Sequence, residues 1–279
     1  MRGWLLGAVL CLSLPTSAAE RIVSLAPFLT DMVLLFEAEA RLVGVLDDQS
    51  LPGELDGVQR VGAHQSLSLE RIVTLRPDLV LGWTSGNSPE LLTRLESLGI
   101  AVRRFDPQTL QAIDRMTLAL GDLLGERERA QALSTAYRVQ LSSSLRSSPG
   151  EGPDVFVQLW REPIFTVAGE QLLSDVLRHC GARNVFASLP GLAPQISVEA
   201  VLAAQPDVIL ALAEERSQAA GWLERWSAYP QLPAVRHDRL YALHSDALVR
   251  PTPAIARGVA ELCGLLAAGR AHPAADQKR

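Results

Sequence analysis

Residues 68–81 read SLERIVTLRPDLVL, and residues 197–210 read SVEAVLAAQPDVIL. Ser, Glu, Pro and Asp occupy the same positions in both copies, and the apolar residues match as well. Each copy is typical of a short helix, a Pro-Asp turn and a buried strand. The copies lie about half the chain apart, whereas solenoid repeats are far shorter. The repeat therefore predicts two similarly built lobes, and we expect a small-molecule site in the cleft between them.

The rest of the chain alternates short apolar runs with helical segments. In the first half, the predicted strands are 21–25, 42–45, 79–83 and 100–105, and the predicted helices are 28–39, 67–75 and 88–98. In the second half, the predicted strands are 155–159, 208–212 and 240–243, and the predicted helices are 172–180, 197–204, 222–228 and 253–266. Such alternation indicates mostly parallel sheets that helices cover on both faces.

The middle of the chain carries no strand pattern. One helix is predicted to about Leu124, a break at Gly125, and a second helix from Glu126 to Leu145 without Pro or Gly. A helix of about twenty residues is roughly 30 Å long, which is enough to connect two lobes. The predicted fold class is therefore α/β, with two similar lobes joined by one long helix. A single rigid helix flexes less than several extended hinge strands, so we expect small lobe movements.

The first nineteen residues are typical of a secretory signal. Arg2 precedes an apolar run from Trp4 to Leu14, and the small residues at 16–19 suit cleavage near residue 18 or 19. The run is too short to span a bilayer comfortably, and no later stretch is longer and as apolar. We therefore expect an exported, soluble, periplasmic chain. The predicted segments are a signal peptide (1–19), an N-terminal lobe (20–124), a bridging helix and linker (125–150), a C-terminal lobe (151–270) and a flexible tail (271–279).

Composition and motifs exclude several classes of function. The net charge of −5 argues against broad nucleic-acid binding, which needs a basic face. The Gly-x-Ser-x-Gly, Walker and Gly-x-Gly-x-x-Gly patterns of common enzymes are missing, so no enzymatic activity is predicted. No His and carboxylate spacing predicts a metal site. Cys180 and Cys263 remain after signal cleavage, and an even number in an exported chain favours a disulfide over two buried thiols.

Several segments carry a family resemblance. IVSLAP at 22–27, LVGV at 42–45 and LERIVTLRPDLV at 69–80 resemble the substrate-binding proteins of ABC importers for vitamin B12, iron-siderophores and haem. The resemblance covers nearly the whole mature chain. It implies the helical-backbone fold of that family, a monomer without a cofactor, and delivery of the ligand to the permease dimer of an ABC importer.

Three further segments resemble the vitamin B12-binding members of that family. They are WTSGN at 83–87, CGARNVF at 180–186, and Ser245-Asp246 with Arg250 and Pro253. The resemblance implies a corrinoid ligand and a Cys180–Cys263 disulfide. His64 and a position near Ala193 stand where those members have tryptophan, and fewer aromatic walls leave a haem or an iron-siderophore as the alternative ligand. An exported enzyme and a scaffolding envelope protein are the alternatives outside the family.

Two tryptophans directly follow predicted strands, Trp83 in the first lobe and Trp160 in the second. Ligands of open α/β sheets bind beyond the carboxyl ends of the strands, and aromatic faces suit a flat corrin or porphyrin. Core packing is the alternative for both rings. The whole set of predicted ligand-binding residues is Phe28, His64, Trp83, Trp160, Phe165, Asp246 and Arg250.

Four more of these residues have more than one interpretation. Phe165 lies within a strand-like stretch and could line the cleft or pack in the core. His64 could stack on a ligand or coordinate its metal, although a lone histidine is more often a surface residue. Asp246 and Arg250 suit polar contacts to ligand amides or propionates, and the alternative is an ordinary surface pair four residues apart.

Glu70 and Glu199 occupy equivalent places in the repeat, early in equivalent helices. Complementing the helix dipole would explain either carboxylate alone. One carboxylate on each lobe also suits docking on a dimeric permease, and the family resemblance implies that these glutamates meet permease arginines.

Overall fold

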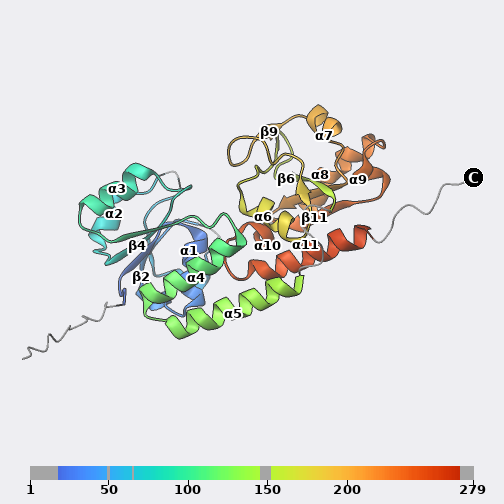
Figure 1. Cartoon of the computed structure of the whole chain (residues 1–279). Helices are drawn as coiled ribbons and strands as arrows, with labels where there is room; N and C mark the ends of the chain where they lie inside the picture. The colour runs from blue at the N-terminus through green and yellow to red at the C-terminus, as the bar shows by residue number, and fades with distance from the viewer. Residues whose placement is uncertain (1–17, 49–50, 65, 145–151, 271–279) are drawn as a thin grey trace, which may run out of the picture.

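The computed structural model describes residues 18–48, 51–64, 66–144 and 152–270. Two α/β lobes stand side by side, and the long helix α5 (Arg127–Ser144) runs along one side of the molecule beneath both (Figure 1). Residues 1–17 of the predicted signal peptide, residues 145–150 of the predicted linker and the predicted tail lie outside the described residues. None of the described helices combines the length and the apolarity needed to cross a membrane.

The N-terminal lobe contains a five-stranded parallel sheet in the order β3-β2-β1-β4-β5. Its strands are β1 (Ile22–Ser24), β2 (Leu42–Val45), β3 (Gln59–Arg60), β4 (Leu79–Trp83) and β5 (Val102–Phe105). Its helices are α1 (Pro27–Leu35), α2 (Leu69–Thr74), α3 (Pro89–Ser97) and α4 (Leu110–Leu124), with short 3-10 turns at Glu39–Arg41 and Gly53–Leu55. Apolar cores lie on both faces of the sheet, as its continuous apolar strands require.

The C-terminal lobe contains a four-stranded parallel sheet in the order β11-β10-β6-β8. Its strands are β6 (Asp154–Gln158), β8 (Arg183–Asn184), β10 (Val208–Ala213) and β11 (Leu240–His244), and a separate antiparallel pair joins β7 (Ile164–Phe165) to β9 (Gln195–Ile196). The helices are α6 (Leu172–His179), α7 (Val198–Ala204), α8 (Arg216–Leu223), α9 (Pro233–Arg236), α10 (Asp246–Val249) and α11 (Ile255–Arg270), with a 3-10 turn at Glu224–Ala228. Two-residue strands and four-residue helices are too short for periodicity to predict, so β3, β8, β9, α9 and α10 were not predicted. β7 contains Phe165, which was expected in a strand-like stretch.

The sequence repeat forms the same unit in both lobes. Ser68 and Ser197 cap α2 and α7, each accepting a hydrogen bond of 3.3 Å from the backbone N–H three residues on. The repeated aspartates then anchor the first strand of each lobe: Asp78 accepts from the N–H of Arg21 at 3.0 Å, and Asp207 accepts from the N–H of Asp154 at 3.0 Å. The repeat therefore fixes a helix and the following strand to the start of each sheet.

Helix α5 joins the lobes as predicted, packing on α4 at one end and on α11 at the other. The structure adds that α4 also reaches into both lobes. Its first residues, Leu110 and Ile113, belong to the C-terminal core, whereas Met116 and Leu120 belong to the N-terminal core. The N–H of Leu110 donates to Asp175 of α6 at 2.8 Å. The connection between the lobes is thus a helical hairpin of which α5 is the longer arm.

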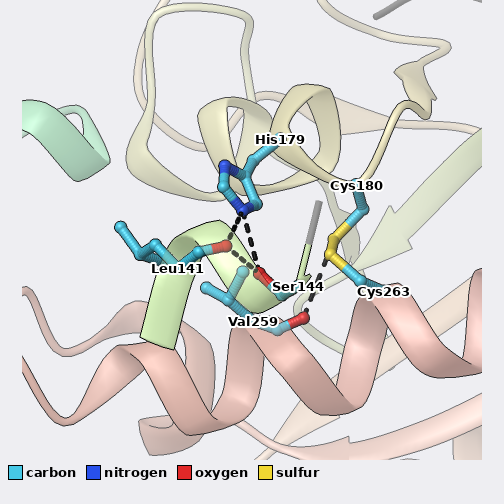
Figure 2. Close-up of a disulfide and its surroundings, with 6 residues drawn as sticks. All are labelled: Leu141, Ser144, His179, Cys180, Val259 and Cys263. Atoms are coloured by element: carbon cyan, nitrogen blue, oxygen red, sulfur yellow. Dashed lines mark hydrogen bonds between the residues drawn. A yellow bond between two sulfur atoms is a disulfide. The ribbon is translucent and has the colours of Figure 1, made fainter. Parts of the chain in front are cut away.

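The far end of α5 is held beside the disulfide. His179 Nε2 lies 2.9 Å from Ser144 Oγ and 3.1 Å from the carbonyl oxygen of Leu141, near the end of α5 (Figure 2). The next residue, Cys180, is bonded to Cys263 of α11, which is the disulfide expected from the sequence. The end of α6 is therefore tied to α5 by hydrogen bonds and to α11 by a covalent bond, which limits how α5 can pivot against the C-terminal lobe.

Candidate functional site

A cavity of about 300 Å³ lies between the lobes, and both lobes contribute to its wall. The N-terminal lobe supplies Phe28, Trp83, Asp106 and Gln108, which follow or end strands β1, β4 and β5. Strand order reverses between β1 and β4, and the crevice beyond such strands is where open α/β sheets bind ligands. The C-terminal lobe supplies Gln171, Leu192, Asp246, Val249 and Arg250.

The indole of Trp83 is held in place from several directions. Its Nε1 donates to Asp106 Oδ1 at 3.2 Å, and Ser85 Oγ donates to the other oxygen of that carboxylate at 2.6 Å. The ring of Phe28 meets Trp83 edge to face, with centroids 5.8 Å apart and an interplanar angle of 89°. Together these contacts present a preformed aromatic corner to the cavity.

The segment after β4 has a structural reason for its glycine and asparagine. A Cβ on Gly86 would lie 2.0 Å from Trp83 Cε3, so only glycine leaves room for the indole. The buried Asn87 accepts from the N–H of Trp83 at 2.7 Å and donates to the carbonyl of Leu25 at 2.9 Å. Asn87 therefore ties the ends of β4 and β1 together, directly beneath the aromatic corner.

Charged groups of both lobes meet at the cavity rim. Arg250 Nη1 donates to Asp31 Oδ2 of helix α1 at 2.9 Å, and Arg250 Nε lies 3.1 Å from Asp246 Oδ2. Burial raises the pKa of the Asp31 carboxyl, although the hydrogen bond from Arg250 opposes this shift. The Asp246–Arg250 pair predicted from the sequence therefore exists, and it is joined to the opposite lobe through Asp31.

His64 lies beside the aromatic corner rather than in the cavity wall. Its ring centroid is 5.7 Å from that of Trp83, at an angle of 42°, and its side chain is exposed. Within the described parts of the chain, no three His, Cys, Asp or Glu side chains form a group that could hold a metal ion. His64 is thus accessible to a ligand that extends past Trp83.

Trp160 and Phe165 do not line the central cavity. Trp160 follows β6 and packs on Trp222, with centroids 5.9 Å apart, over a separate hollow of about 450 Å³. Its side chain is 52 % exposed. Phe165 lies in β7 and is partly buried. Of the seven predicted residues, the structure gathers Phe28, Trp83, Asp246 and Arg250 in one cavity wall and places His64 next to it.

Sequence reasoning missed Asp31, Asp106, Gln108, Leu192 and Val249. Asp106 directly follows the predicted strand 100–105, so the rule that selected Trp83 could have selected it too. Asp31 had no comparable signal, because its importance comes from Arg250 of the other lobe.

Glu70 and Glu199 occupy equivalent exposed positions in the first turns of α2 and α7. Both helices lie on the side of the molecule opposite α5 (Figure 1). Ser68 Oγ donates to Glu70 Oε2 at 3.2 Å. Hydrogen bonds from the backbone N–H of Glu199 and from Ser197 lower the pKa of the Glu199 carboxyl. Each lobe therefore presents an acidic group on the same side.

The chain is similar to several known proteins. Residues 22–247 match the periplasmic binding protein family. A vitamin B12-binding protein of Vibrio parahaemolyticus is 31 % identical over 253 residues, which cover 90 % of this chain and 91 % of the relative. The crystal structure of the periplasmic vitamin B12-binding protein BtuF of Vibrio cholerae has a TM-score of 0.81 at 33 % identity, covering 90 % of this chain and 98 % of that one. The apo periplasmic haem-binding protein RhuT of Roseiflexus sp. RS-1 shares the fold, with a TM-score of 0.74 at 23 % identity, over 90 % and 99 % of the two chains.

Proposed function

The chain belongs to the periplasmic binding protein family, and from this premise we propose that it captures a corrinoid of the vitamin B12 type between its lobes and delivers it to an ABC importer. The similarity to vitamin B12-binding proteins over about nine tenths of both chains supports this ligand class. The chain acts as an exported monomer whose signal peptide is cleaved near residue 18 or 19, and it carries out no turnover.

The interlobe cavity is the observation that carries this proposal. Phe28 and Trp83 offer ring faces and edges to a flat macrocycle, while Asp246 and Arg250 offer a hydrogen-bond acceptor and donors to its peripheral amides. The cavity volume of about 300 Å³ is at the lower end for small-molecule sites, so a corrinoid would extend beyond it. The exposed rings of His64 and Trp160 are candidates for contact with the remainder of the ligand.

Docking on the permease dimer follows from the two equivalent glutamates. Glu70 and Glu199 are exposed on the same side of the two lobes, so both can engage a symmetric partner at once. Charge-assisted pairs with permease arginines would fix the register and speed the encounter. The helical hairpin between the lobes favours docking with little change of lobe spacing.

A haem or a ferric siderophore is the second candidate ligand, and His64 is the observation that favours it. An exposed imidazole beside Trp83 could approach the metal of a flat macrocycle bound there. Titration calorimetry of the mature chain with cyanocobalamin, haemin and a ferric siderophore, together with visible spectra, separates the candidates. We expect saturable one-to-one binding of cyanocobalamin, and exclusive binding of haemin or the siderophore would overturn the corrinoid assignment.

A further inference from the structure

We propose that a hollow between β3 and α2 is a second docking subsite, in which Arg60 receives a carboxylate side chain of the permease beside the residue that pairs with Glu70. This inference rests on the proposed function, because it takes the permease as the partner. It adds a contact that the paired glutamates do not supply, and it lies in the N-terminal lobe alone.

The hollow has a volume of about 650 Å³ and opens along the edge of the N-terminal sheet. One wall is the chain from Asp56 to Val61, which includes the edge strand β3. The other wall is helix α2, which contributes Glu70 and Arg71. The hollow is therefore continuous with the surface on which Glu70 is exposed.

Arg60 lines this hollow and is partly buried, so part of its side chain is accessible there. Its Nη1 is buried and has no hydrogen-bond partner among the described residues, so a carboxylate pairs with it only once the guanidinium turns toward the hollow. A buried guanidinium N–H without an acceptor is costly, and a carboxylate is the acceptor that matches its geometry and charge. Arg71 turns toward the same strand, since its Nη1 donates to the backbone carbonyl of Arg60 at 3.4 Å.

The charges around the hollow favour a peptide segment over a free anion. Asp56 and Glu70 line it together with Arg60 and Arg71, so the site is not uniformly positive. An occupant that carries a carboxylate for Arg60 and a cation for Glu70 matches both signs. A protein segment with an acidic and a basic side chain close together has this pattern, and a permease segment that already reaches Glu70 can supply it.

The second copy of the repeat has no arginine at the position of Arg71. The repeat places Ala200 directly after Glu199, where the first copy has Arg71 after Glu70. The two docking surfaces are therefore similar in their glutamates and different in what surrounds them. The hollow at β3 gives the N-terminal lobe an additional contact with the same permease segment.

Charge reversal tests the contact. Binding of the ligand-loaded protein to its cognate importer in lipid nanodiscs is measured for Arg60→Glu and for Arg103→Glu. Arg103 is exposed on β5, at the opposite edge of the same sheet, so its variant makes the same change in net charge. We expect about tenfold weaker binding for Arg60→Glu and a change within about twofold for Arg103→Glu. Equal losses would indicate general electrostatics and overturn the proposal.

Filling the hollow provides a test that leaves the charges intact. Gly57 lines the hollow, and a Cβ at this position would meet no atom within 4 Å, so Gly57→Trp introduces a bulky side chain there. Its thermal unfolding curve should match that of the wild type. Gly264 on α11 is equally open and far from β3, and Gly264→Trp is the control. We expect Gly57→Trp alone to weaken importer binding, by about tenfold or more. Unchanged binding would show that nothing enters the hollow and would overturn the proposal.

Two further readouts separate this inference from the proposed function. Cyanocobalamin affinity should be unchanged in Arg60→Glu and Gly57→Trp, because the hollow is distinct from the interlobe cavity. If Glu70→Arg abolishes importer binding while Arg60→Glu leaves it unchanged, the docking role of Glu70 is supported and the proposed contact of Arg60 is overturned. Light scattering of the free protein identifies another occupant: a dimer that Gly57→Trp dissociates would assign the hollow to a second copy of the chain and contradict the permease contact.

Discussion

Arg250 Nη1 lies 2.9 Å from Asp31 Oδ2, so an ion pair joins the two lobes at the rim of the cavity although 219 residues separate its partners. Arg250 also lies 3.1 Å from Asp246 within its own lobe. Both side chains of the interlobe pair are 27 % exposed, so solvent screens it only in part. The arginine proposed to contact the ligand is therefore held in position by the opposite lobe.

Replacing Asp31 by Asn should weaken ligand binding, because Arg250 loses the partner that holds it toward the cavity. We expect about two- to fivefold lower affinity for cyanocobalamin, which corresponds to the free energy of a partly exposed ion pair. Calorimetry measures the effect, and Glu37→Gln is the control, since Glu37 pairs with Arg129 at the end of α1 outside the cavity wall. Equal affinity of Asp31→Asn and the wild type would show that the pair does not position Arg250.

On acidification, the ion pair between Asp31 and Arg250 should break at a higher pH than an ion pair of a carboxylate with an ordinary pKa. Burial raises the pKa of Asp31 above 3.8, so protonation in the folded state begins at a higher pH than in the unfolded state. The pair is lost as the pH falls through that raised pKa. The protonated Asp31 carboxyl also stabilises the folded state at low pH. This contribution to the free energy of unfolding is lost as the pH rises through the raised pKa of Asp31.

Nuclear magnetic resonance of the Asp31 side chain follows this titration directly. The Asp31→Asn variant should show a flatter dependence of ligand affinity on pH in the acidic range above pH 3.8 than the wild type. Identical pH profiles of the two proteins would contradict the assignment.

Trp83→Ala should lower ligand affinity more than any other single change in the cavity wall. A large aromatic anchor in a binding site contributes about 2 kcal/mol or more, which corresponds to roughly thirtyfold in the dissociation constant. Asp106→Ala should have a smaller effect of the same sign, because the indole Nε1–H loses its acceptor. Phe165→Leu, outside this cavity, is the control, and calorimetry on all three variants with thermal unfolding curves separates binding from stability.

Reversing the charges of Glu70 and Glu199 together should abolish uptake of the ligand while leaving its affinity unchanged. Glu90 provides a matched control, since it also follows a capping serine in the first turn of a helix and is exposed. Uptake by cells that express Glu70→Arg/Glu199→Arg is compared with uptake by cells that express Glu90→Arg. Normal uptake with the double variant would remove both glutamates from the docking surface.

Removing the disulfide should destabilise the protein without changing the cavity. Cys180 and Cys263 are 83 residues apart, and closing such a long loop lowers the entropy of the unfolded chain by an amount worth about 2–4 kcal/mol. Cys180→Ala/Cys263→Ala should therefore unfold at lower denaturant concentration, with unchanged cyanocobalamin affinity. Reduction of the wild type should give the same shift, and a fall in affinity would show that the bond shapes the site.

The predicted elements that the structure confirms share one property. Strand β4 matches the predicted 79–83, and β6 and β10 match their predictions to within one residue at each end, because each is a run of buried apolar residues between turn signals. Helices α4 and α5 were predicted on either side of Gly125, whose φ of 73° lies in the left-handed region that glycine favours. Local sequence patterns were sufficient to predict these strands and helices, because such patterns report which residues of a segment are buried.

The repeat, the parallel α/β order, the helix between the lobes and the place of Trp83 at the end of a strand could all be predicted from local sequence patterns. Three contacts could not be predicted in this way: Arg250 meets Asp31, Asp106 holds Trp83, and Trp160 packs on Trp222 at a separate hollow. The physical reason is that periodicity records which face of a segment is buried. It carries no information about which distant side chain that face will meet, and that choice is made when the two lobes pack together.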